Sequence, residues 1–111
     1  MTKDIVNTET YAELCEAMGA DFAAELLDTF LSEGPTMLAN LKTAVDAQDA
    51  DGYRRAAHSI KSNAEIFGAK ALADLSRQME LTSLSDAPPP VVELETTWSD
   101  TETALRSLCD E

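Results

Sequence analysis

Apolar side chains recur along most of this chain at alternating steps of three and four residues, the spacing that places them on one face of an α-helix. The first such stretch runs from about Thr8 to Met18, with Thr8 as the expected N-cap and Gly19 as the expected stop. Its apolar stripe consists of Tyr11, Leu14, Cys15 and Met18. The pattern predicts a short leading helix.

The second stretch opens at Asp21, the expected N-cap, and continues to about Asp46. Its seam consists of Leu27, Leu31, Gly34, Leu38, Leu41 and Val45. Gly34-Pro35 interrupts it, and a proline inside a helix removes one backbone hydrogen bond and crowds the preceding turn. Because the seam keeps its phase across Pro35, the pattern favours one kinked helix and leaves two helices open.

Three more helices are predicted downstream. One follows Asp49 or Asp51 as its cap and ends near Phe67 and Gly68, and the next spans about Lys70–Leu84. The clearest loop of the chain, Ser-Asp-Ala-Pro-Pro-Pro, comes next. The inner face of the last helix then carries Val91, Leu94, Trp98, Thr101, Leu105 and Leu108.

Four long amphipathic helices with short connections must bury their stripes against one another. We therefore expect an all-α fold, an antiparallel four-helix bundle with a short N-terminal helix, as a single domain over residues 1–111. Trp98 is expected in the core, and Met18, Met37 and Met79 as packing residues.

The net charge is −13, from 21 acidic and 8 basic residues. Such a charge repels nucleic acid and anionic membranes and suits partners that carry a basic patch. No apolar run approaches transmembrane length, and the first residues lack the apolar segment of a signal peptide. We therefore expect a cytoplasmic protein, with Cys15 and Cys109 as reduced thiols. Met1 and the short tails favour a free-standing chain, expected to be a monomer.

His58 is the only histidine, and its place on the third helix can be calculated. At about 100° per residue, several polar side chains fall within about 60° of it on the helical wheel: Arg54, Arg55, Lys61, Ser62 and Glu65. Apolar residues occupy the opposite side: Tyr53, Ala56, Ile60 and Phe67. The imidazole is therefore predicted to point out of the bundle.

Three of the eight basic residues, Arg54, Arg55 and Lys61, surround His58 in an otherwise acidic chain. Ordinary solvated charges on an exposed helix face would give the same pattern. Yet a neutral imidazole is a good nucleophile near pH 7, since the ordinary pKa of histidine is about 6.5. A cation one turn away can stabilise a transferring phosphoryl group, and small neighbours such as Ser59 and Ser62 let a partner approach. These features suit a phosphohistidine carrier.

The run from Ala57 to Ala69 also resembles the signature of histidine-containing phosphotransfer (HPt) domains, in which lysine follows the histidine by three residues and glycine by ten. Here those residues are His58, Lys61 and Gly68. The segments before and after the motif resemble the family's second helix and its partner helix, so the likeness covers most of the chain. Many members have glycine directly after the lysine, where this chain has Ser62, which is also small.

The resemblance implies a four-helix bundle, phosphorylation on Nε2 of His58 and docking of receiver domains over its helix. The donor and acceptor would be the receiver domains of a hybrid histidine kinase and of a response regulator. The resemblance places Lys61 near the phosphoryl oxygens, and Glu80 where the family often hydrogen-bonds the other imidazole nitrogen. A solvated charge at the end of a helix is an equal alternative for Glu80. The expected docking surface has contributions from the second helix and comprises His58, Arg54, Arg55, Ser62, Glu65, Ile66 and Gly68.

No cofactor is expected, and the Mg²⁺ needed for transfer should come from the receiver, because no acidic triad surrounds His58. There is no glycine-rich phosphate loop, so ATP-dependent kinase activity is not expected. Neither cysteine has a metal-ligand partner at zinc-site spacing. An acyl carrier would need an exposed Asp-Ser-Leu, and Leu84-Ser85-Asp86 has the wrong order. A helical adaptor without chemistry is the remaining alternative, and a His58→Ala substitution would leave its function intact.

Overall fold

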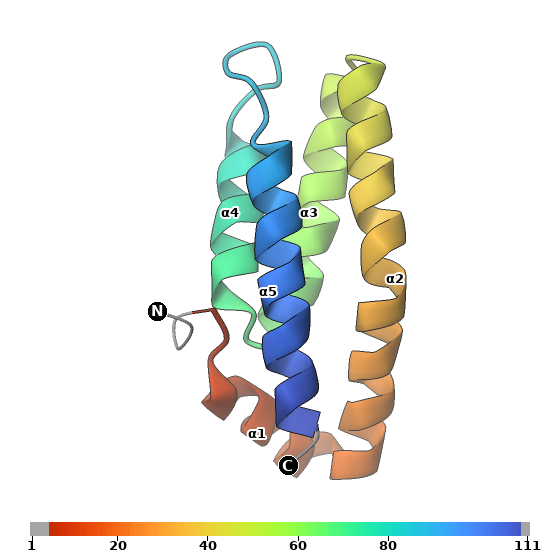
Figure 1. Cartoon of the computed structure of the whole chain (residues 1–111), viewed down its shortest axis with the longest axis vertical. Coiled ribbons are helices and arrows are strands. Elements are labelled where there is room, and N and C mark those ends of the chain that lie inside the picture. Colours follow the sequence, from red (N-terminus) through yellow and green to blue (C-terminus); the bar gives the residue numbers. More distant parts are fainter. Residues whose placement is uncertain (1–4, 110–111) are drawn as a thin grey trace.

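The alternating apolar positions form helices that bury their stripes in one core. Figure 1 shows how these helices are arranged. The computed structural model describes residues 5–109, and no strand occurs among them. The helices are α1 (Thr8–Met18), α2 (Ala20–Asp46), α3 (Ala50–Ile66), α4 (Lys70–Leu81) and α5 (Val91–Cys109). Helices α2 to α5 run along the long axis of the molecule, and α1 lies across one end. The predicted all-α bundle with a short leading helix is confirmed.

The centre of the bundle is aromatic. The ring of Phe30 on α2 stacks on Phe67, with ring centroids 5.0 Å apart, and meets the indole of Trp98 edge-on at 5.3 Å. All three residues are buried, as are Leu27, Leu41, Ile60, Leu72, Met79, Leu94 and Leu105. Aromatic pairs in these two geometries are favoured by the charge distribution of the rings. The prediction of Trp98 as a core residue is confirmed.

Helix α2 is 27 residues long and continues through Pro35, so the structure supports one helix rather than two. Gly34, just before the proline, is buried against Trp98. A Cβ atom at Gly34 would lie 2.0 Å from Cζ2 of the indole, far inside van der Waals contact. Glycine at this position therefore permits α5 to pack its largest side chain directly on the α2 backbone.

Two predicted N-caps were wrong, although α1 begins at Thr8 and ends at Met18 as predicted. The N-cap of α1 is Asn7 and not Thr8, because the Asn7 side chain accepts a hydrogen bond from the backbone N–H of Glu9 at 3.0 Å. Helix α2 begins at Ala20 directly after Gly19, so Asp21 lies in its first turn and makes no cap hydrogen bond. Gly19 adopts φ 90°, a conformation that glycine tolerates and that joins the two helices without a longer loop.

The predicted end of α4 was also wrong, since the helix stops at Leu81 and not at Leu84. Thr82 is extended, and the Ser83 hydroxyl oxygen accepts a hydrogen bond from the backbone N–H of Ser85. Serine hydroxyls that bond to nearby backbone groups compete with helix formation, which accounts for the early end.

The predictions for the methionine and cysteine side chains are confirmed only in part. Met18 is exposed, contrary to the prediction of a packing residue, because it is the last residue of α1 and no further turn covers it. Met79 is buried and Met37 half-buried, as predicted. Cys15 is a free thiol, whereas the side chain of Cys109 lies outside the described residues.

Backbone contacts hold the segment before α1 against the turn between α3 and α4. The N–H of Asn7 donates to the carbonyl of Gly68 at 2.7 Å, and the N–H of Ala71 donates to the carbonyl of Ile5 at 3.3 Å. Gly68 has φ 71°, and a Cβ there would lie 2.6 Å from the Asn7 carbonyl oxygen. This turn fixes the direction in which α4 runs back along α3.

Candidate functional site

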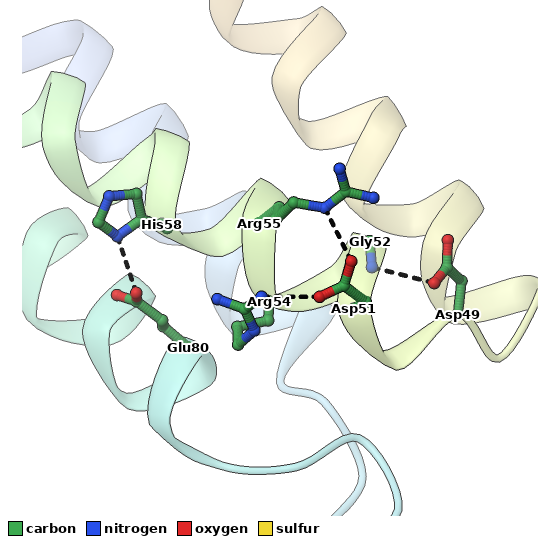
Figure 2. Close-up of polar contacts among 7 residues, drawn as sticks. All are labelled: Asp49, Asp51, Gly52, Arg54, Arg55, His58 and Glu80. Atoms are coloured by element: carbon green, nitrogen blue, oxygen red, sulfur yellow. Dashed lines mark hydrogen bonds and ion pairs between the residues drawn. The ribbon is translucent and has the colours of Figure 1, made fainter.

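Helix α3 carries His58 near its middle, and the start of this helix is firmly defined. The Asp49 carboxylate accepts a hydrogen bond from the backbone N–H of Gly52 at 3.0 Å, so Asp49, and not Asp51, is the N-cap. Figure 2 shows this contact at the start of the helix that bears His58. From there the buried residues Tyr53, Ala57, Ile60 and Ala64 turn one side of α3 into the core, which leaves His58 on the outer side.

Helices α3 and α4 pack closely, and both bury small residues. Ala57 and Ala64 on α3 and Ala73 on α4 are all buried. Small side chains let helix backbones approach one another, so polar groups at the edge of the contact come within hydrogen-bonding distance. The residue brought to His58 in this way is Glu80, in the last turn of α4.

A carboxylate shared by two basic side chains forms the centre of the candidate site. Nδ1 of His58 lies 2.7 Å from Oε2 of Glu80, and Nζ of Lys61 lies 3.2 Å from Oε1 of the same carboxylate. The His58 side chain is 54% exposed, whereas those of Glu80 and Lys61 are 16% and 21% exposed. Figure 2 shows the imidazole above Glu80 with its second nitrogen turned away from the carboxylate.

The environment of Glu80 favours its charged form. Partial burial, the largest single influence, opposes ionisation, but hydrogen bonds from Lys61 and His58 and their positive charge together outweigh it. The pKa of the Glu80 carboxyl therefore lies below its usual value. An ionised carboxylate only accepts hydrogen bonds, so the proton in the contact belongs to Nδ1 of His58. In the neutral imidazole, Nε2 then keeps a free lone pair.

A second ionic group precedes His58 on α3, with Arg54 and Arg55 about one turn before it and Asp51 about two turns before it. Asp51 binds both neighbouring arginines, with 2.7 Å between its Oδ1 and a terminal nitrogen of Arg54 and 3.1 Å between its Oδ2 and Nε of Arg55. The hydrogen bond from Arg54 is the largest cause, and the charge of Arg55 the next, of a pKa of Asp51 below its usual value. All three side chains are exposed, so the group contributes to the surface charge rather than to stability.

The other predicted site residues lie further along α3. Ser62 is half-buried, and Glu65 and Ile66 are exposed. Gly68, in contrast, is buried beneath the N-terminal segment. Its place in the motif reflects the tight α3–α4 turn, so it is no part of an exposed docking surface.

Sequence reasoning missed two contacts of this site. The Asp51 pairs could have been found, because Asp51 precedes Arg54 by three residues and Arg55 by four, the spacings that favour ion pairs on a helix. The Lys61–Glu80 pair joins two helices and had no local signal. From its place on the polar side of the helix, Lys61 is expected to face solvent. Its side chain is instead only 21% exposed, where it pairs with Glu80.

The described part of the chain contains no helix long and apolar enough to cross a membrane. Within the same residues, no group of three or more His, Cys, Asp or Glu side chains is arranged to hold a metal ion.

Comparisons with known proteins agree with this geometry. A family model described as "Hpt domain" matches residues 25–110. The phosphorelay protein LuxU of Vibrio vulnificus, in strains YJ016 and CMCP6, is 32% identical over 77 residues, which cover 69% of this chain and 67% of LuxU. The crystal structure of histidine-containing phosphotransfer protein B (HptB) from Pseudomonas aeruginosa PAO1 superimposes with a TM-score of 0.86 and 27% identity, covering 96% of this chain and 95% of that one. The chain belongs to the Hpt domain family and is a histidine phosphotransfer protein of a phosphorelay.

Proposed function

We propose that Nε2 of His58 carries the phosphoryl group, accepting it from the aspartate of one receiver domain and passing it to that of another. One observation supports this assignment above all: Nδ1 is bound to Glu80 at 2.7 Å while the ring is 54% exposed. The protein thereby presents a single nucleophilic nitrogen to solvent, in one tautomer, on a rigid helix.

The transfer step needs no proton movement. The lone pair of Nε2 attacks the phosphorus of the receiver's aspartyl phosphate, an N–P bond forms, and the P–O bond breaks to release the aspartate carboxylate. The imidazole, already protonated on Nδ1, becomes positively charged, and the Glu80 carboxylate at 2.7 Å stabilises that charge. Passing the group on is the reverse reaction with a second aspartate.

Lys61 contributes a positive charge near the phosphoryl oxygens in this proposal. It lies one turn after His58, and its ammonium is held by the second oxygen of Glu80. Positioned charge accounts for most of the catalysis in phosphoryl transfer, because little covalent chemistry is asked of the protein. Glu80 therefore orients the imidazole with one oxygen and Lys61 with the other.

The docking surface proposed for receivers consists of the outer face of α3 around His58, namely Arg54, Arg55, Ser62, Glu65 and Ile66, with contributions from α2. Ile66 is an exposed large hydrophobic residue and offers apolar contact two turns from the histidine. The arginines offer positive charge to a partner whose reacting group is an aspartate.

We further infer a carrier without ATP-dependent kinase activity that acts as a cytoplasmic monomer. Mg²⁺ would come from the receiver, because the Glu80 carboxylate at His58 and the Asp51 carboxylate, about two turns before it, are each already paired with basic side chains.

Incubation with a receiver domain labelled by ³²P-acetyl phosphate tests the assignment. We expect label on the wild-type chain that is acid-labile and absent from His58→Gln. Label that persists in His58→Gln would rule out this site, and a biological output that survives His58→Ala would favour an adaptor. Lys61→Ala and Glu80→Ala should each slow transfer by about 10–100-fold, the scale expected for lost positioned charge.

A further inference from the structure

A hollow of about 420 Å³ opens beside the His58 site, between the first turns of α3 and the end of α4. The residues that line it include Asp51, Tyr53, Arg54, Glu80, Leu81 and Leu84. Glu80 belongs to both places, since its carboxylate holds His58 and its side chain lines the hollow. Any protein that brings a reacting group to Nε2 of His58 therefore lies within reach of this depression.

One edge of the hollow carries an uncovered apolar side chain, Leu81, among lining residues that are mostly polar. Leu81 follows Glu80 directly and is 72% exposed, in a molecule whose other leucines mostly lie in the core. Leu84 is half-buried, and Tyr53 is buried at the α3 side. Large exposed apolar side chains next to a hollow are typical of protein interfaces, where one apolar anchor often provides much of the binding energy.

The charge of this side of the molecule is opposite in sign to the rest. Helices α3 and α4 carry five basic residues and four acidic ones, a formal charge of +1, whereas the whole chain carries −13. The remaining segments therefore carry −14. Asp51, Arg54 and Glu80 all line the hollow. Asp51 is paired with both Arg54 and Arg55, and Glu80 with Lys61, so this group of charges keeps a surplus of one positive charge.

Resting on the proposed function, we propose that this hollow selects among receiver domains by accepting an apolar side chain that has a carboxylate beside it. The apolar group packs on Leu81, and the carboxylate approaches Arg54. The hollow adjoins His58, so the partner that fills it is the one that exchanges phosphate there. Leu81 and Arg54 are thus specificity residues, whereas the chemistry belongs to His58.

The test compares two substitutions with matched controls across receiver domains of the source organism, each phosphorylated with acetyl phosphate. Leu81→Ala is matched by Val92→Ala, since Val92 is 76% exposed on α5 and lies outside the hollow. Arg54→Ala is matched by Arg106→Ala, because Arg106 is equally exposed and pairs with Glu102 as Arg54 pairs with Asp51.

We expect Leu81→Ala to slow phosphoryl transfer from the fastest receivers by about tenfold and to leave the rates of the slow receivers unchanged. The difference in transfer rate between fast and slow receivers should therefore become smaller. Arg54→Ala should slow the same receivers by about threefold, an effect that weakens as salt is raised. The control variants should keep wild-type rates. If Leu81→Ala and Arg54→Ala match their controls with every receiver, the proposal is overturned.

Binding measured in a His58→Gln background separates this proposal from the proposed function. Calorimetry with the unphosphorylated receivers should show affinity reduced by Leu81→Ala and Arg54→Ala even where no phosphate can be carried. Loss of phosphoryl transfer in the His58→Gln single variant tests the carrier role of His58 and says nothing about binding at the hollow. Equal affinities for all variants in that background would remove the hollow as a selective site.

Discussion

The indole of Trp98 packs directly on the backbone of Gly34, where a Cβ atom would lie 2.0 Å from Cζ2. We therefore expect Gly34→Ala to destabilise the fold by about 1–3 kcal/mol or more, the usual cost of overpacking, although alanine is the better helix former. Chemical denaturation measures the loss. Thr36→Ala, at an exposed position two residues away, is the control and should be near neutral. Trp98→Leu should make the Gly34→Ala change less costly, and strict additivity of the two would contradict the packing explanation.

Ser76 is fully buried on α4, and its hydroxyl has no hydrogen-bond partner within the described part of the chain. A buried hydroxyl left unpaired costs about 1–3 kcal/mol. We expect Ser76→Ala to leave stability unchanged or to raise it by about 1 kcal/mol. Thr101→Val is the contrast, since the buried Thr101 hydroxyl donates to the Thr97 carbonyl at 2.7 Å, and its removal should lower stability by about 0.5–1.5 kcal/mol. A clear loss in Ser76→Ala would mean that the hydroxyl has a partner after all.

Asp49 and Asp51 both stand near the start of α3, and only Asp49 caps it. Asp49→Ala should cost about 1 kcal/mol, as expected for the loss of an N-cap. Asp51→Ala should cost clearly less than Asp49→Ala, because it removes only exposed ion pairs. Thermal melting of both variants gives the comparison, and the opposite ranking would move the cap to Asp51.

The depressed pKa of Glu80 links the site to the stability of the fold. A carboxyl whose pKa is lower in the folded than in the unfolded state stabilises fully above its unfolded pKa, about 4.5, and the benefit is lost as pH falls through the lower folded value. Wild type should therefore be more stable than Glu80→Gln at neutral pH, and the two melting temperatures should converge once the pH falls below the lowered folded-state pKa of Glu80. Glu33→Gln, an exposed carboxylate on α2, is the control. A difference that persists unchanged at low pH would show that the charge of Glu80 is not involved.

The sequence predicts the architecture well because the period of its apolar positions determines which helix faces are buried. Trp98 lies in the core as its seam position requires, and α2 keeps its phase through Pro35. Helix ends are less predictable, since they depend on single hydrogen bonds such as that from the N–H of Glu9 to the Asn7 side chain. The serine contacts that end α4 early are equally local and equally weak.

The exposed imidazole of His58 also follows from the helical wheel. The coupling of Lys61 to Glu80 does not, because it depends on how closely α3 and α4 approach and on their register. The resemblance to a known family placed Glu80 near His58, and the structure adds that the same carboxylate holds Lys61. Gly68 is a residue of the family motif that was predicted at the docking surface. The structure places it in the tight turn between α3 and α4, buried against Asn7 and Thr10.

In the proposed carrier role of His58, the contact between its Nδ1 and Glu80 has a kinetic consequence for the relay. Because Nδ1 is hydrogen-bonded to Glu80, such a carrier has one nitrogen, Nε2, that can hold the phosphoryl group. The donor and the recipient must therefore bind at this atom one after the other. Turnover then follows ping-pong kinetics, with parallel lines in double-reciprocal plots, and an excess of unphosphorylated recipient competes with the donor. The relative abundance of the two partners would therefore set the direction of flux as strongly as their chemistry does.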